Sequence, residues 1–247
     1  TVASNYDYPI IRIDTNQGVY GLGEVRDAGG KDNALIFKGM LLKRNPMQAE
    51  QILRSIRSFS GHGRAGGGYS AIDVALNDIR GKVLGQPVWK LAGLDGVKPL
   101  LTTFTVGADA PEVMAEKAAA YVQARALKLK LTGEVELDIA RVRAVRARCP
   151  QPWIGVDANQ GYTQQTLPAL LPVLLECNVS LLEQPCPRGG EQHLDGIEHA
   201  LPFAADESIL DLAELEAKHH RFDVINIKLD KCGGLTEGLL MATRARE

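Results

Sequence analysis

Six consecutive repeats of a strand-like segment and a helix-like segment occupy the chain from residue 100 to its end. Repeated β-then-α units predict parallel strands that are joined by right-handed crossovers, which makes the fold class α/β. The strand-like segments are 101–106, 127–131, 153–157, 179–183, 203–206 and 224–229, and the helix-like segments are 111–124, 137–149, 164–177, 192–199, 212–219 and 235 onward.

Two architectures fit this alternation, a doubly wound sheet and a closed (β/α)8 barrel of the TIM type. A dinucleotide-binding doubly wound sheet carries a glycine-rich fingerprint after its first strand. Here the first strand is followed by Gly107-Ala108-Asp109, which lacks that fingerprint. The barrel is therefore favoured. It needs eight units, so we expect a barrel truncated after six βα units that cannot close by itself.

The first part of the chain has a different texture. A hairpin is expected over 9–14 and 19–25, and helices follow it. The stretch 91–99 is rich in glycine and proline, which is typical of a domain boundary. We therefore expect an α+β domain over 1–98 and a partial barrel, the catalytic domain, over 99–247.

The composition excludes several classes of protein. The net charge of the 247 residues is −2, and no basic cluster is interleaved with aromatic residues, which argues against nucleic acid as the main partner. The most apolar run, 167–175, contains two prolines and is shorter than the roughly 20 residues that a membrane span needs. The four cysteines show no CxxC spacing, so reduced thiols and a cytoplasmic location are expected.

Charged side chains occur within or at the end of five successive expected strands. Neighbouring positions are separated by one βα unit, so all of them reach the same end of the barrel, where the active sites of such barrels form. The residues are Lys128 and Lys130 in the second strand, Asp157, Glu183 and Asp206 at the ends of the third to fifth strands, and Lys228 in the sixth.

An ionised group in a buried parallel strand costs several kcal/mol unless it is paired or bound to a metal. Internal salt bridges between the lysines and the carboxylates are one explanation, but they do not require such even spacing. Three carboxylates on adjacent strands instead suit Mg²⁺, which prefers oxygen ligands. No histidine occupies these positions, which argues against zinc. The expected metal ligands are Asp157, Glu183 and Asp206.

The lysines flank the three carboxylate strands, so Lys130 and Lys228 would face each other across the metal in a closed barrel. A desolvated lysine can act as a base at neutral pH. Lys128 shares a strand face with Lys130 and would either lower the pKa of Lys130 or hold a substrate carboxylate. Two opposed bases predict epimerisation or racemisation, whereas a single lysine could run a syn elimination.

These positions carry a family resemblance. The chain resembles the enolase superfamily in its muconate-lactonizing-enzyme subgroup, which is also described as the mandelate racemase/muconate lactonizing enzyme family. The motifs that carry the resemblance are Leu127-Lys128-Leu129-Lys130, Val156-Asp157-Ala158-Asn159-Gln160-Gly161, Glu183-Gln184-Pro185, Ala205-Asp206-Glu207-Ser208 and the segment 226–234 with Lys228.

The resemblance implies a role for each of these residues. Residues 1–98 would be a capping domain, whose loops near 25–31 and 60–68 close over the substrate. Mg²⁺, with Mn²⁺ as a substitute, would be bound by the three carboxylates. Lys130 and Lys228 would be the acid–base pair, and Lys128 and Asn159 would contact the substrate or its enolate.

The resemblance also implies a small carboxylate substrate, which could be a dipeptide, an N-acylamino acid or an acid sugar. Segments 103–107 and 228–237 are most similar to L-Ala-D/L-Glu dipeptide epimerases, while segments 24–29 and 61–64 are more similar to acid-sugar dehydratases. An isomerase is therefore the first hypothesis. A dehydratase or cycloisomerase, which are lyases, and an inactive fragment of such an enzyme are the alternatives. A homo-oligomer is expected.

Overall fold

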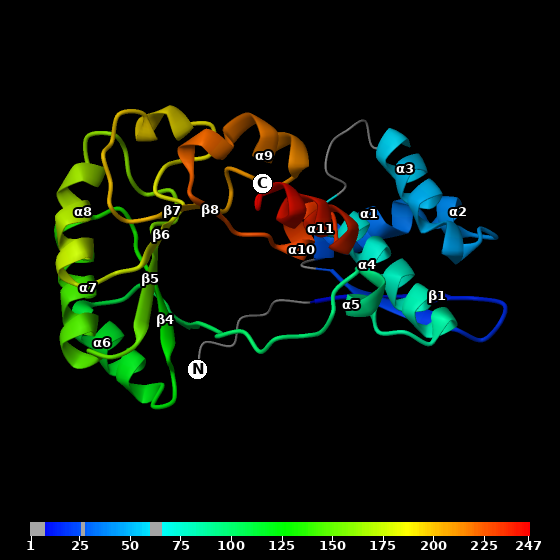
Figure 1. Cartoon of the computed structure of the whole chain (residues 1–247), viewed down its shortest axis with the longest axis horizontal. Coiled ribbons are helices and arrows are strands. Elements are labelled where there is room, and N and C mark those ends of the chain that lie inside the picture. The colour runs from blue at the N-terminus through cyan, green and yellow to red at the C-terminus, as the bar shows by residue number, and fades with distance from the viewer. Residues whose placement is uncertain (1–7, 26–27, 60–65) are drawn as a thin grey trace. The chain divides into compact units, whose positions relative to one another are not determined.

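Six parallel strands form one sheet in the order in which they follow along the chain (Figure 1). The computed structural model describes residues 8–25, 28–59 and 66–247. The predicted alternation of strands and helices from residue 100 onward is confirmed. The strands are β3 (Phe104–Val106), β4 (Ala126–Lys130), β5 (Trp153–Asp157), β6 (Leu181–Glu183), β7 (Phe203–Ala205) and β8 (Val224–Ile225).

Three helices, α6 (Pro111–Ala120), α7 (Val135–Arg148) and α8 (Leu167–Glu176), lie along the same face of this sheet (Figure 1). Strands buried by helices should be almost wholly apolar. The core bears this out, because Leu127, Leu129, Ile154, Val156, Leu182 and Phe203 are all fully or almost fully buried. The sheet thus provides a rigid base for the residues at its carboxyl end.

The expected helix over 192–199 is largely absent. The structure has a short 3-10 helix, η2 (Glu191–Leu194), and residues 195–202, all of them described, contain no helix. Gly196 adopts a left-handed φ of 77°, a conformation that ends helices. The next crossover contains α9 (Leu212–Lys218) followed by η3 (His219–Arg221).

Within the described residues, β3 and β8 are the two edges of the sheet, so the six units form an open, barrel-like sheet. Along the same described ranges, no helix combines the length and the apolar character that crossing a membrane requires.

The expected hairpin of the first domain is confirmed. Strands β1 (Ile10–Asp14) and β2 (Tyr20–Glu24) pair in antiparallel fashion and pack against helix α4 (Gly66–Leu84). Gly21 and Gly23 allow this packing, because a Cβ at either position would lie about 2 Å from a backbone oxygen of α4. The close approach explains why glycine alternates in this strand.

The remaining helices of this region are short, apart from α3. Asn45 begins the α3 region, because its side chain accepts a hydrogen bond from the Met47 N–H at 3.0 Å. Ile52, Ile56, Ile72 and Leu76 pack together between α3 and α4. The elements are α1 (Ala28–Ile36), α2 (Lys38–Leu41), η1 (Pro46–Gln48), α3 (Ala49–Phe59) and α5 (Val88–Leu91).

The chain divides into two units, one of residues 1–98, 210–213 and 227–247 and the other of residues 99–209 and 214–226. The last two helices, α10 (Leu229–Cys232) and α11 (Leu235–Arg244), therefore belong to the first unit, where both contact α4. The assignment of residues 99–247 to one catalytic domain stays a prediction.

Asp73 of α4 holds the beginning of α11. Its carboxylate accepts hydrogen bonds from the Thr236 N–H at 3.0 Å and from the Thr236 hydroxyl at 2.5 Å. Gly234 is the N-cap residue of α11 and has no side chain that could cap the helix, so Asp73 of α4 caps it instead. Burial raises the pKa of Asp73, although the hydrogen bonds from Thr236 act in the opposite direction.

We expect Asp73→Leu to lower the free energy of unfolding by about 2–3 kcal/mol, because both hydrogen bonds from Thr236 are lost, one of which caps α11. Asp73→Asn is the matched control and should cost less than about 1 kcal/mol. Its amide keeps the shape and one oxygen to accept from the Thr236 N–H, and its nitrogen can donate to the Thr236 hydroxyl. Urea unfolding of the two variants and the native chain measures both effects. Equal losses in the two variants would show that the cap does not depend on the side-chain oxygen.

Candidate active site

Charged residues from three adjacent strands lie side by side at the carboxyl end of the sheet. In the strand register, Lys130 of β4 is opposite Asp157 of β5, and Asp157 is opposite Glu183 of β6. Lys128 lies two residues before Lys130 on β4 and therefore on the same face of the strand. The structure thus brings together four of the residues that the sequence singles out.

These four residues form a network of ion pairs. Lys128 Nζ lies 2.9 Å from Asp157 Oδ2 and 2.5 Å from Glu183 Oε2, so one ammonium group bridges two carboxylates. Lys130 Nζ lies 2.6 Å from the same Asp157 oxygen. Asp157 is 1% exposed and Glu183 5% exposed. The network contains the internal salt bridges that the alternative explanation expects, and it also shows that the two carboxylates can share one cation.

The electrostatics favour the charged forms of this network. Burial acts to lower the pKa of Lys128, but its bonds to Glu183 and Asp157 outweigh burial and raise that pKa. Burial likewise acts to raise the pKa of Asp157, and the two lysines outweigh it, so that pKa is lowered. Lys128 is therefore held as a cation, which suits the stabilisation of negative charge.

Two asparagines support the carboxylates. The backbone N–H of Asn159 donates to Asp157 Oδ1 at 2.9 Å, and Asn159 adopts a left-handed φ of 46° in doing so. Its side chain is exposed, and its predicted contact with substrate stays a prediction. Asn226 Nδ2 donates to Glu183 Oε1 at 2.8 Å, which orients the second carboxylate.

Asp206 follows β7 directly and is buried, as the strand-end pattern predicts. Its backbone N–H donates to the side-chain oxygen of Gln184 at 2.9 Å. Asp206 thus lies at the end of the strand next to β6, which ends in Glu183. The metal-binding role of all three carboxylates stays a prediction.

The placement of Lys228 within a strand is wrong. Strand β8 ends at Ile225, and Lys228 is the N-cap residue of the short helix α10. The strand ends early because Asn226 is the last residue whose N–H pairs with β7, through Ala205 O at 2.8 Å. Lys228 belongs to the first unit and Lys130 to the second, so their opposed arrangement stays a prediction.

The three carboxylates suit Mg²⁺ by their chemistry, since they are oxygen donors at the ends of neighbouring strands. Across residues 8–25, 28–59 and 66–247, no group of three or more aspartate, glutamate, histidine or cysteine side chains lies close enough together to hold a metal ion. Instead, Lys128 occupies the position between Asp157 and Glu183. A cation bridging two buried carboxylates is the observation that supports the fit.

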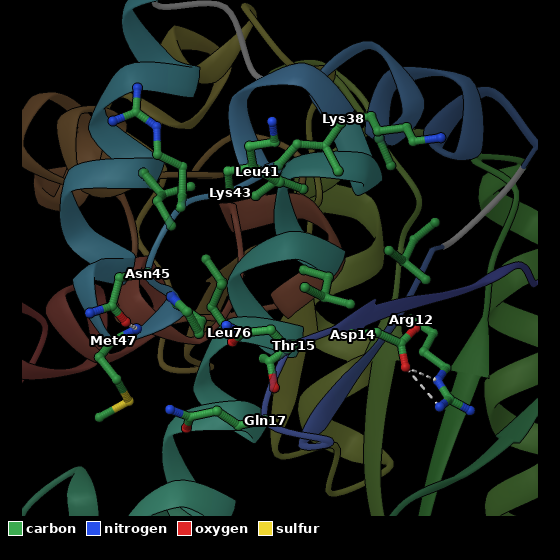
Figure 2. A pocket seen from close by; sticks show the side chains of 18 of the residues that line it. Arg12, Asp14, Thr15, Gln17, Lys38, Leu41, Lys43, Asn45, Met47 and Leu76 are labelled. Carbon is green, nitrogen blue, oxygen red and sulfur yellow. Dashed lines mark hydrogen bonds and ion pairs between the residues drawn. The ribbon is translucent and has the colours of Figure 1, made fainter.

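A hollow of about 970 Å³ lies elsewhere, within the first unit (Figure 2). It is lined by β1, by the segment 41–47 and by part of α4. Arg12 and Asp14 form an ion pair on its wall, and Lys38 and Lys43 also line it. None of the predicted site residues lines this hollow, so it is distinct from the carboxylate network.

The predicted closing loops are described only in part, since residues 26–27 and 60–65 are outside the described residues. Of the rest, residues 28–31 are the beginning of α1 and residues 66–68 the beginning of α4, so these parts are helical and not loop. The closure of the loops over a substrate stays a prediction.

Three polar residues beside the network and Asp206 were not singled out as site residues from the sequence. Gln184, Ser208 and Asn226 are polar residues that directly follow strands or lie close to strand ends. Their closeness in the sequence to the charged strand-end residues could have been used to identify them. Uncharged side chains are common in loops, however, and the sequence alone does not distinguish a hydrogen-bonded one from a solvated one.

Comparison with known proteins places the chain in a family. Residues 1–93 match the family described as "Mandelate racemase / muconate lactonizing enzyme, N-terminal domain", and residues 113–247 match "Enolase C-terminal domain-like". The chain therefore belongs to the mandelate racemase/muconate lactonizing enzyme family of the enolase superfamily, as its motifs indicate.

Similar curated proteins are epimerases. The L-Ala-D/L-Glu epimerase of Escherichia coli is 37% identical over 182 residues, which cover 74% of this chain and 57% of that protein. The hydrophobic dipeptide epimerase of Enterococcus faecalis is 33% identical and covers 94% of this chain and 70% of its own length. The chain thus spans 57% and 70% of the length of these two relatives.

Solved structures agree with the fold. The dipeptide epimerase of Enterococcus faecalis, complexed with Mg and the dipeptide L-Leu-L-Tyr, matches with a TM-score of 0.89 at 32% identity. The match covers 97% of this chain and 72% of that one. The N-succinyl Arg/Lys racemase of Bacillus cereus matches with a TM-score of 0.90 at 28% identity, covering 98% and 70%. Known relatives are thus epimerases and racemases, and some, such as a cis-3-hydroxy-L-proline dehydratase, are lyases.

Proposed function

We propose that this chain carries the metal-binding and acid–base residues of a Mg²⁺-dependent epimerase, which inverts the carbon α to a carboxylate and whose substrates are dipeptides. The observation that carries the proposal is the network in which Lys128 bridges Asp157 and Glu183 beside Lys130. Membership of the enolase superfamily gives this network its chemical context.

Each residue has a defined task in this proposal. Asp157, Glu183 and Asp206 hold Mg²⁺, and Mn²⁺ can substitute for it. When bound, the metal supplies a fixed positive charge that stabilises negative charge on the substrate carboxylate. In the metal-free chain the pKa of Lys128 is raised by its carboxylate partners. In this proposal its ammonium group adds a second positive charge beside the metal.

Lys130 and Lys228 move the protons. The amine of one lysine accepts the proton from the α-carbon, and the ammonium of the other donates a proton to the opposite face of that carbon. The configuration inverts while the mass of the substrate is unchanged. Asn159 lies beside Asp157 with an exposed side chain, so it is available to contact the substrate.

The dipeptide is proposed from the relatives, because two solved relatives are dipeptide epimerases complexed with Mg and a dipeptide. N-acylamino acids are the next candidates, since an N-succinyl-Arg/Lys racemase is 32% identical over 96% of this chain. A cytoplasmic location and a homo-oligomeric state stay predictions.

A lyase is the second candidate function. A cis-3-hydroxy-L-proline dehydratase is 28% identical over 96% of this chain, and a single lysine base is sufficient for a syn elimination. Product mass separates the two activities, because epimerisation preserves the mass and dehydration removes one water.

The test is exchange of the α-proton in deuterated water, followed by proton NMR and mass spectrometry. L-Ala-L-Glu, L-Leu-L-Tyr, an N-succinylamino acid and cis-3-hydroxy-L-proline, which carries the hydroxyl that a dehydratase removes, are each incubated with the chain and Mg²⁺. Exchange with inversion supports the proposal, and loss of water supports the lyase. Mg²⁺ binding without exchange of any compound would instead support the remaining hypothesis, that the chain by itself is an inactive fragment.

A further inference from the structure

We propose that Gln184 is a positioning residue that fixes Asp206 relative to Glu183 and thereby sets the geometry of the metal site. This inference rests on the proposed function, because it assumes that the two carboxylates bind Mg²⁺. Gln184 touches neither the metal nor the substrate in this proposal, and it acts only through the residues that it holds.

The side-chain amide of Gln184 is fully buried and uses its whole hydrogen-bonding capacity. Its oxygen accepts from the Asp206 N–H at 2.9 Å and from the Ser208 N–H at 3.1 Å. Its nitrogen donates to the Cys186 carbonyl at 2.8 Å and to the Ser208 hydroxyl at 2.7 Å. A single side chain, which directly follows β6, therefore holds the segment that begins with Asp206 by three hydrogen bonds.

The backbone of Gln184 continues this connection to both neighbouring strands. Its N–H donates to Ala204 of β7 at 2.8 Å, and its carbonyl accepts from the Gln160 N–H, just after β5, at 2.9 Å. Gln184 directly follows Glu183 in the chain. It is thus bonded to the ends of all three strands that carry the predicted metal ligands.

The backbone conformation of Gln184 is unusual. Its φ is 43°, in the left-handed region that residues other than glycine, asparagine and aspartate seldom adopt. Such a conformation persists only where surrounding contacts enforce it, and it is commonly found at functional sites. Here the four hydrogen bonds of the Gln184 side chain and the two of its backbone hold the residue in this conformation.

An amide is the group that this position requires. An alkyl side chain would leave the N–H groups of Asp206 and Ser208 buried without a partner. A carboxylate could accept from both N–H groups, but it could not donate to the Cys186 carbonyl and would add a charge beside Glu183 and Asp206.

Precise placement matters more for Mg²⁺ than for a larger cation. Mg²⁺ demands near-ideal octahedral geometry, whereas Ca²⁺ accepts variable geometry at longer distances. If Gln184 positions Asp206, then loosening it weakens Mg²⁺ binding more than Ca²⁺ binding. A residue that merely stabilises the fold would weaken both equally, through the fraction of folded protein.

The experiment titrates the metal-free full chain with Mg²⁺ and, separately, with Ca²⁺ by calorimetry. The variants are Gln184→Met and the milder Gln184→Asn, whose asparagine tolerates the left-handed backbone and so favours folding. Gln164→Met is the matched control, because Gln164 is exposed and, among the described residues, its side chain bonds only to the Asp195 carbonyl. Thermal unfolding without metal records the folded fraction of each variant.

We expect the Mg²⁺ affinity to fall at least tenfold in Gln184→Met and by a smaller factor in Gln184→Asn, with less than threefold change for Ca²⁺. Gln164→Met should match the native chain. Unchanged Mg²⁺ binding in both Gln184 variants, or equal losses for the two cations, would overturn the positioning role and leave the proposed function standing. A native chain that does not bind Mg²⁺ would overturn both.

Discussion

Replacing Lys130 with methionine is expected to lower the rate of epimerisation by about 10²–10⁴-fold, which is the contribution of general acid–base catalysis by one group. Methionine keeps the length and apolar body of lysine and removes only the amine. Exchange of the α-proton should be lost from one epimer and persist from the other, because Lys228 is still present. NMR in deuterated water, started separately from each epimer, measures this asymmetry.

The same variant should keep its metal affinity. Lys130 Nζ lies 2.6 Å from Asp157 Oδ2, so its removal frees that oxygen from one competing cation. Lys117→Met is the matched control, since Lys117 is an exposed lysine that is also paired with an aspartate, Asp109. Its rate should equal that of the native chain. Inversion at the native rate in Lys130→Met would exclude Lys130 as an acid or base.

The second large effect is expected for Asp157→Asn, which should remove the stabilisation of the chain by Mg²⁺. A ligand present at 100 times its dissociation constant raises the free energy of unfolding by about 2.7 kcal/mol. The native chain should show a gain of this size, and the variant none. Urea unfolding with and without Mg²⁺ measures the difference between the two proteins.

Asp157→Asn should also destabilise the metal-free chain, by about 1.5–3 kcal/mol, because both lysines lose their charged hydrogen bonds to Asp157. Lys128 would keep Glu183 as a partner, whereas Lys130 would lose its contact with Asp157. Asp109→Asn is the control, because Asp109 pairs with Lys117 on the surface, where ion pairs contribute about 0–1 kcal/mol. An equal gain from Mg²⁺ in the native chain and in Asp157→Asn would refute the role of Asp157 as a ligand.

Much of the fold could be predicted, because its signals are local. The strands from β3 to β8 are short and mostly apolar, as the strands of a buried parallel sheet are, and an α-helix follows each of them except β6. The failures have local reasons as well. Gly196 interrupts the expected helix at 192–199, and β8 stops before Lys228 because pairing with β7 ends at Asn226.

The candidate site was predictable only in part. The regular spacing of one βα unit was sufficient to place Lys130, Asp157 and Glu183 at one end of the sheet, where they are paired in register. The bridge that Lys128 makes between two carboxylates was not predictable. The position of a lysine in a strand tells on which face its side chain lies, but the flexible side chain can place its ammonium group at many points.

The sequence by itself determined the order of the strands, the end of the sheet at which the charges gather and the membership of the enolase superfamily. These properties follow from short-range patterns and from motifs read in order. Only the tertiary structure decided which groups hold those charges in place. Gln184 bonds to Asp206 and Ser208 across 22 and 24 residues, and Asp73 caps a helix 163 residues away at Thr236. Such contacts form because buried polar groups need hydrogen-bond partners, and the folded chain supplies these partners from distant positions. The periodicity of the sequence does not predict which positions these are.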